Sequence, residues 1–93
     1  MILSFRCRQT RQIWNGQRTQ SLPPDIQNRA LRKLRLLDAA QTVNDLKVPP
    51  GNRLEALSGT RAGQMSIRIN DQWRLCFIWD GTDATDVEIV DYH

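Results

Sequence analysis

Two arginines in the second half of the chain, Arg68 and Arg74, have the spacing needed to face each other across a hairpin. A three-residue loop ending at Gln72 pairs Ile67 with Leu75 and keeps the large apolar side chains on one sheet face. The same register places the two arginines directly opposite each other on the other face, where like charges are unfavourable. An anionic ligand would remove that cost, and the forked guanidinium group suits phosphate.

A third arginine, Arg61, lies in the glycine-flanked loop of residues 58–63, just before this hairpin. We expect the guanidinium groups of Arg61, Arg68 and Arg74 to converge on one concave patch that holds a phosphate group. The alternative is that they are solvated residues of an exposed sheet face, because such faces are normally polar.

The sequence ends in Asp91, Tyr92 and His93. Histidine titrates near neutral pH, so His93 is the candidate general acid, and the charge of Asp91 should favour its protonated form. Tyr92 is expected on the arginine face, where it can stack on a base, and Asp91 is expected to position its neighbours. With arginines holding the phosphate, these residues suffice for metal-free RNA cleavage, in which the 2′-hydroxyl of the substrate is the nucleophile. The alternative for His93 is a frayed end without a role.

The elements that must position these residues follow from the pattern of apolar residues. Alternation over residues 3–7 predicts a short N-terminal strand. Thr10 is expected to cap a brief helix that ends at Gly16. The Pro-Pro-Asp sequence of residues 23–25 predicts the start of a second helix, which should end near Ala40.

This second helix is predicted to be amphipathic. Its apolar residues are spaced four, four and three positions apart and form one stripe: Ile26, Ala30, Leu34 and Leu37. Its opposite face carries three cations: Arg29, Arg32 and Lys33. Such a face is usually solvated, but it can also follow an RNA backbone.

From Arg53 onward the apolar period is two, which is typical of strands. The expected strands lie at residues 54–56, 65–69 and 73–79 and at a last segment that contains Val87 and Ile89. The predicted architecture is a single α+β domain over residues 1–93. It has a short N-terminal strand, and two helices pack on one face of a twisted antiparallel sheet.

Charge is distributed unevenly along the chain. All 13 basic residues lie in residues 1–74 with five acidic ones, a net charge of +8, whereas residues 75–93 carry five acidic residues and no basic one. Eleven of the 13 basic residues are arginine, which binds phosphate through a fork of donors and stacks on bases. This composition favours a nucleic-acid partner.

Composition also limits the other classes of function. The two cysteines and one histidine do not have metal-ligand spacing, so we expect no metal and no other cofactor. No apolar run approaches the roughly 20 residues that span a bilayer, and the first residues lack the apolar segment of a signal peptide. The expectation is a cytoplasmic protein without a membrane partner.

Three segments resemble HigB-type toxins of the RelE/ParE superfamily: residues 51–57, residues 61–74 and the ending at 87–93. The order of Gln-Trp-Arg followed by Asp-Tyr-His is specific to that family. The resemblance implies a RelE-like fold and a bacterial type II toxin that cleaves mRNA in the ribosomal A site. It also implies a helix-turn-helix HigA antitoxin as the partner, with a toxin monomer inside the complex. Arg68 and Arg74 match the family's arginine positions, and residues 91–93 match its catalytic segment.

The chain departs from the family at one position. Some members carry lysine in the loop after the second predicted strand, where this chain has Ser58. The resemblance then implies either weaker cleavage or compensation of the missing cation by Arg53 or Arg61.

Two other functions fit the same residues. A gyrase-inhibiting toxin of the ParE type shares the scaffold, and fold does not fix function, although such a toxin has no need of a general acid such as His93. A non-catalytic nucleic-acid-binding module would use the same arginines, and it would bind with a steep salt dependence and release no cleavage products.

Overall fold

The computed structural model describes residues 1–91, and over these residues its helices and strands largely follow the apolar periodicity. Tyr92 and His93 lie outside the described residues. Within them, two α-helices are followed by an antiparallel sheet of four strands in the order β1-β2-β3-β4. The elements are α1 (Arg8–Trp14), α2 (Pro24–Ala39), β1 (Glu55–Ala56), β2 (Met65–Arg68), β3 (Trp73–Trp79) and β4 (Ala84–Asp91). Short 3₁₀-helices connect them: η1 (Val43–Lys47), η2 (Pro50–Asn52) and η3 (Gly59–Arg61).

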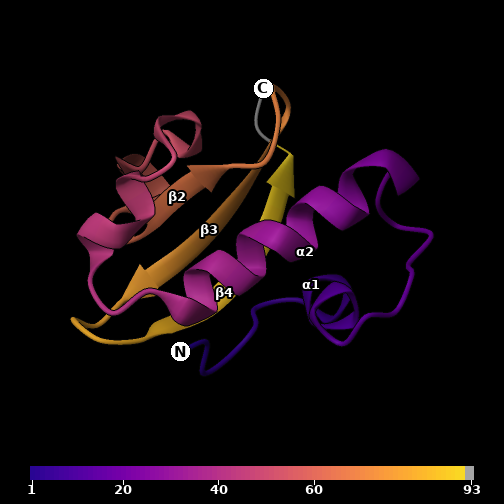
Figure 1. The fold of residues 1–93 in the computed structure, drawn as a ribbon, viewed down its shortest axis with the longest axis horizontal. Coiled ribbons are helices and arrows are strands. Elements are labelled where there is room, and N and C mark those ends of the chain that lie inside the picture. The colour runs from indigo at the N-terminus through magenta and orange to yellow at the C-terminus, as the bar shows by residue number, and fades with distance from the viewer. Residues whose placement is uncertain (92–93) are drawn as a thin grey trace.

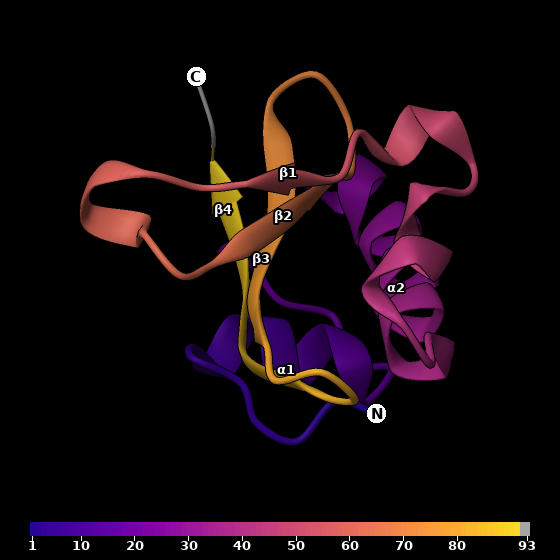
Figure 2. The same ribbon diagram turned by 90° about the vertical axis from the view of Figure 1, so that its left-hand side faces the viewer.

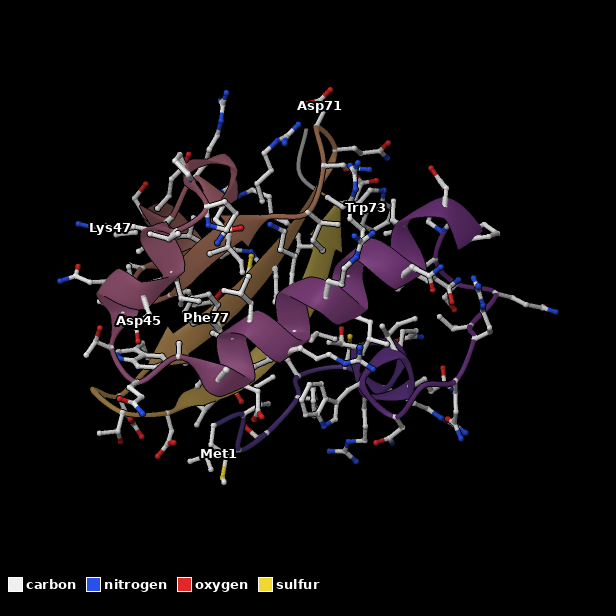
Figure 3. The ribbon with its side chains drawn as sticks, viewed as in Figure 1. Met1, Asp45, Lys47, Asp71, Trp73 and Phe77 are labelled. Atoms are coloured by element: carbon white, nitrogen blue, oxygen red, sulfur yellow. The ribbon has the colours of Figure 1, made fainter. Side chains whose placement is uncertain are left out.

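Helix α2 begins and ends as predicted. Pro24 occupies its first position, where a missing N–H costs nothing, and Asp25 complements the helix dipole in the first turn. The predicted apolar stripe is buried at all four positions: Ile26, Ala30, Leu34 and Leu37. The helix crosses one face of the sheet (Figure 1), and the buried ring of Phe77 packs in the core between helix and sheet (Figure 3).

Helix α1 differs from the prediction at its start. Cys7 is the N-cap, and Thr10 lies inside the helix, fully buried. The Oγ1 atom of Thr10 accepts a hydrogen bond of 2.9 Å from the backbone N–H of Ile89, so this threonine anchors α1 to β4 instead of capping it. Gly16 follows the helix with φ of +79°, as expected for the residue after a helix end.

The predicted N-terminal strand is reduced to two parallel bridges with β4. Ile2 pairs with Ala84 and Phe5 pairs with Val87, so the bridges are three residues apart in each segment. An odd step breaks the alternation of side chains. Leu3 is accordingly 54% exposed, whereas Phe5 is partly buried against the core.

The register of the β2–β3 hairpin is the predicted one. Ile67 lies opposite Leu75 and Arg68 lies opposite Arg74. The backbone N–H of Ile69 donates to the carbonyl of Trp73 at 2.9 Å and closes the three-residue loop. Figure 2 shows α2 on one side of the sheet and the loop that contains η3 projecting on the other side.

The α+β arrangement inferred from the sequence is therefore confirmed, with both helices packed against the antiparallel sheet. None of the helices within residues 1–91 is both long enough and apolar enough to cross a membrane.

Candidate functional site

Arg74 is a firmly anchored cation of the sheet. It lies on the sheet face away from α2, which we call the outer face and which carries Ser66, Arg74, Cys76 and Glu88. Only 9% of Arg74 is exposed. Its Nε donates to Ser66 Oγ at 2.8 Å, its Nη2 donates to the carbonyl of Arg53 at 2.6 Å, and its Nη1 lies 3.9 Å from Glu55 Oε1. The guanidinium plane is thus fixed while the residue retains a small exposed edge.

The carbonyl that holds Arg74 is itself fixed by the local backbone. Arg53 follows η2 with φ of +46°, in the left-handed region, and its side chain is exposed. The preceding residue, Asn52, is fully buried and donates through Nδ2 to the carbonyls of Leu46 and Val48, at 3.1 and 3.2 Å. The side chain of Asn52 therefore ties the segment before β1 into one conformation.

Arg61 also lies on the outer face, and it reaches that face from η3. Its Nη1 is 3.2 Å from Glu88 Oε1 and 3.0 Å from Gln64 Oε1. Burial raises the pKa of the Cys76 thiol, and Arg61 and Arg74 are both close enough to oppose that shift through their charges. The structure thus brings together two of the three arginines that were expected to converge.

The third arginine, Arg68, occupies a different place. Its side chain pairs with Asp71, and it lines a cleft between α2 and the end of β2. Figure 3 shows Asp71 at the tip of the turn after β2. This helix cleft has a volume of about 360 Å³. Its basic lining residues are Arg29, Arg32, Lys33 and Arg68. The helix face and the hairpin arginine, which were predicted as separate candidates, therefore share one cavity.

Lys33 shows the electrostatic character of the helix cleft. Its Nζ donates to Oδ1 of the buried Asn52. Burial lowers the pKa of Lys33 below its ordinary value of 10.5, and the nearby charges of Arg29, Arg68 and Arg32 lower it further. An anion in this cleft would relieve the mutual repulsion of these cations.

The opposition of Arg68 and Arg74 does not need an external anion, contrary to the expectation from the register. Arg68 has Asp71 as a partner, and Arg74 has Ser66, Glu55 and a backbone carbonyl. The two guanidinium groups have different partners, so acceptors within the chain offset the cost of the like charges.

Asp91 ends β4 beside the β2–β3 turn. It lies opposite Trp73 in the sheet and accepts a hydrogen bond of 3.2 Å from Gln72 Nε2. The preceding residue, Val90, is the strand partner of Arg74. Strand β4 thus leads the chain past Arg74 to the predicted acid–base segment, of which Tyr92 and His93 lie beyond the described residues.

Ser58, at the position where some toxins carry lysine, is exposed and precedes η3. Its carbonyl accepts the backbone N–H of Arg61 at 3.3 Å, so it helps to form the turn that presents that arginine. Arg61, the cation nearest to Ser58 in the sequence, therefore pairs with Glu88 on the outer face.

Sequence reasoning missed the acceptors that orient these arginines. Ser66 and Glu88 had a detectable signal, because the alternation that places Arg74 on the outer face places both of them there as well. Glu55 and Gln64 had none, because their positions depend on how β1 and the η3 loop fold. Among residues 1–91, no three potential metal ligands form a cluster.

Comparison with known proteins identifies the family. Residues 3–93 match the HigB-like toxin family, which is described as the RelE-like toxin of the type II toxin-antitoxin system HigB. The chain belongs to the HigB-like toxin family. It is 45% identical over 80 residues to Toxin HigB-1 of Vibrio cholerae serotype O1, covering 85% of this chain and 84% of that protein. It is 28% identical over 93 residues to Endoribonuclease HigB of Proteus vulgaris, covering 100% of both. Membership of this family makes the chain a toxin of a type II system, with an antitoxin as its partner.

Proposed function

We propose that this HigB-like toxin is a ribosome-dependent endoribonuclease that cuts mRNA without a metal ion and so inhibits translation. The observation that carries the proposal is the pair of oriented arginines, Arg61 and Arg74, beside the strand that leads into residues 91–93. The relative named as an endoribonuclease aligns over the whole chain and supports the same activity.

In the proposed reaction, the 2′-hydroxyl of the substrate loses its proton to solvent as its oxygen bonds to the adjacent phosphorus, and the bond from phosphorus to the 5′-oxygen breaks. His93 donates a proton to that leaving oxygen, and the product ends in a 2′,3′-cyclic phosphate. Arg74 and Arg61 bind the phosphate oxygens, where charge develops in the transition state. Tyr92 stacks on a base or orients the nucleophile, and Asp91 positions its neighbours.

In the proposed complex, the helix cleft binds the RNA on one side of the scissile bond. Arg68 stands at the β2 end of the cleft, and the α2 cations line the rest of it: Arg29, Arg32 and Lys33. The exposed side chain of Arg53 lies next in sequence to Asn52, which Lys33 contacts. These cations contact phosphates and contribute affinity without reading sequence.

We propose that the antitoxin is a HigA-type helix-turn-helix protein that holds one toxin monomer in a hetero-oligomer. Its surface should be acidic where it meets the arginines, because a basic active face has to be covered in resting cells. The proposed site of action is the cytoplasm, where ribosomes and mRNA meet, and residues 1–93 act there as one domain.

The test is to add the purified chain to translating ribosomes and to map new mRNA ends by primer extension. Cuts inside codons that need the ribosome are expected. Deletion of His93 should lower cleavage roughly 10²- to 10⁴-fold, as for loss of a general acid, while ribosome pelleting stays almost unchanged. The matched control is Lys47→Gln, which removes an exposed charge outside both surfaces.

Each competing function predicts a different result. Equal cleavage of free mRNA contradicts ribosome dependence. Loss of gyrase activity without RNA cleavage indicates the ParE-type function, and RNA binding without cleavage products indicates a binding module. Native cleavage by the His93 deletion variant would remove that residue from the mechanism and leave Tyr92 as the next candidate.

A further inference from the structure

A second arginine-lined cleft lies where the N-terminal segment enters α1. Its volume is about 480 Å³, and its three cations are Arg6, Arg8 and Arg11. All three residues are exposed, and the lining of this cleft within the described residues includes no acidic side chain. It shares no lining residue with the helix cleft. We call it the N-terminal cleft.

One aromatic ring, Phe5, lines this cleft, and it packs against Trp14 and Arg11. The rings of Phe5 and Trp14 are 6.4 Å apart between centroids, and Arg11 Cζ lies 5.9 Å from the centroid of Phe5. Phe5 is also bridged to Val87 of β4. Because Arg11 and Trp14 already contact this ring, it is not a free platform on which an unpaired base can stack.

The lining also includes three side-chain amides: Gln12, Asn15 and Gln17. Amides donate and accept hydrogen bonds, so they suit ribose hydroxyls as well as phosphate oxygens. Arginines combined with amides, and without an open stacking surface, match the backbone of an RNA double helix better than a single strand, whose bases need stacking partners.

We propose that the N-terminal cleft binds the sugar–phosphate backbone of double-helical RNA and serves as a second RNA contact, separate from the outer face and the helix cleft. That the ribosome supplies this RNA rests on the proposed function. The binding of an RNA helix by the cleft is a property of the chain that can be measured without ribosomes.

The experiment uses the double variant Arg6→Gln/Arg8→Gln in the full chain, which leaves Arg11 in its contact with Phe5. The control is Arg35→Gln/Lys47→Gln, which removes the same net charge from exposed positions outside both clefts. The probe is a fluorescein-labelled RNA hairpin with 2′-O-methyl riboses, which keeps a helical backbone and cannot be cut. Binding is followed by anisotropy over a series of KCl concentrations.

Each lost phosphate contact should reduce the slope of log K against log[KCl] by roughly 0.7 to 0.9, so the double variant should lose about 1.5 units of slope. At moderate salt its affinity should fall roughly tenfold or more, while the control changes far less. An unchanged slope, or an equal loss in the control, overturns the proposal. Loss of binding to a labelled polyglutamate peptide instead of the hairpin assigns the cleft to an acidic protein and also overturns it.

A second measurement separates this proposal from the proposed function. With ribosomes and mRNA, the double variant should cleave more slowly at low ribosome concentration and reach the wild-type rate at saturation. A lower rate at saturation would place Arg6 or Arg8 in the reaction and contradict the assignment of a docking role. Should the double variant lose the expected slope relative to its control while the wild-type chain cuts no mRNA, the cleft is supported and the proposed nuclease activity fails.

Discussion

Nη2 of Arg74 lies 2.6 Å from the carbonyl oxygen of Arg53, so one candidate RNA-binding residue fixes another through its main chain. The side chain of Arg53 takes no part in this contact and is exposed. The backbone carbonyl of Arg53 therefore holds Arg74 in place, while the side chain of Arg53 is available to bind RNA. Substitutions at position 53 can separate these two roles.

Arg74→Ala should destabilise the fold by about 2 kcal/mol, because the change leaves Ser66 Oγ and the Arg53 carbonyl without their donor. Arg74→Lys should recover little of the lost stability, since a single ammonium group cannot replace a planar guanidinium group that donates to two acceptors. Urea denaturation measures the stability and the ribosome assay measures cleavage. Ser66→Ala is the control: it removes one hydrogen bond, costs about 1 kcal/mol and should keep most of the activity. An unchanged urea midpoint for Arg74→Ala would show that these contacts do not stabilise the fold.

Arg53→Asn should leave the free energy of unfolding within about 0.5 kcal/mol of the wild type, because asparagine tolerates the left-handed region and keeps the carbonyl. RNA affinity should fall, since one cation is lost. Arg53→Val removes the same charge but resists a positive φ, so it should also destabilise the fold and disturb Arg74. Equal stability of the two variants would contradict the assigned role of the backbone.

Glu88→Gln should change stability and RNA binding in opposite directions. The Arg61–Glu88 ion pair has side chains that are 30% and 22% exposed, so its loss should cost no more than about 1 kcal/mol. Arg61, no longer neutralised, should bind phosphate more tightly and increase the salt dependence of RNA binding. Thermal unfolding and hairpin anisotropy measure the two effects. A decrease in both would show that Glu88 positions Arg61 more than it competes with the RNA.

The lowered pKa of Lys33 should make the affinity of the helix cleft for anions depend on pH. Burial and three neighbouring arginines lower its pKa below 10.5 in the free protein, whereas a bound phosphate should raise it. Binding therefore takes up protons in the window between these two pKa values, and affinity should fall as pH rises through that window. Lys33→Arg keeps the charge and should abolish this dependence, which hairpin titrations at increasing pH can show.

The same shift has a consequence for folding. Because the folded pKa of Lys33 lies below the unfolded one, the unfolded chain binds more protons in the range between them, and stability should rise with pH there. The anion-free protein should show this rise, and it should be absent from Lys33→Arg.

The hairpin and helix α2 were predictable because strong periodicities left one solution. A three-residue loop between Ile69 and Trp73 keeps the apolar residues of both strands on one face, whereas a two-residue loop would place an arginine among them, and the observed register has the three-residue loop. Similarly, the Pro-Pro-Asp start and the apolar stripe fix the length and the buried face of α2.

The direction of the arginine side chains was not predictable in the same way. Alternation places Arg68 on the outer face, but Asp71 and the packing of α2 over the end of β2 decide where its long side chain lies. The contact between Arg74 and Arg53 depends on a left-handed residue, and the sequence shows no glycine there to indicate one. The role of Thr10 was wrong for a related reason, since its partner Ile89 is 79 residues away in the chain.

The bridges between the N-terminal segment and β4 also bear on how the antitoxin binds. The backbone N–H groups of Ala84 and Val87 donate to Met1 and Ser4, and that of Ile89 donates to Thr10. The edge of β4 that does not pair with β3 is thereby occupied by residues near the N-terminus of the same chain. The strand at the opposite edge of the sheet, β1, has only two residues. Addition of a partner strand to either edge would gain few main-chain hydrogen bonds. We therefore expect an antitoxin to recognise this toxin mainly through side chains, with charge complementarity to the arginines in place of the main-chain hydrogen bonds of an added strand.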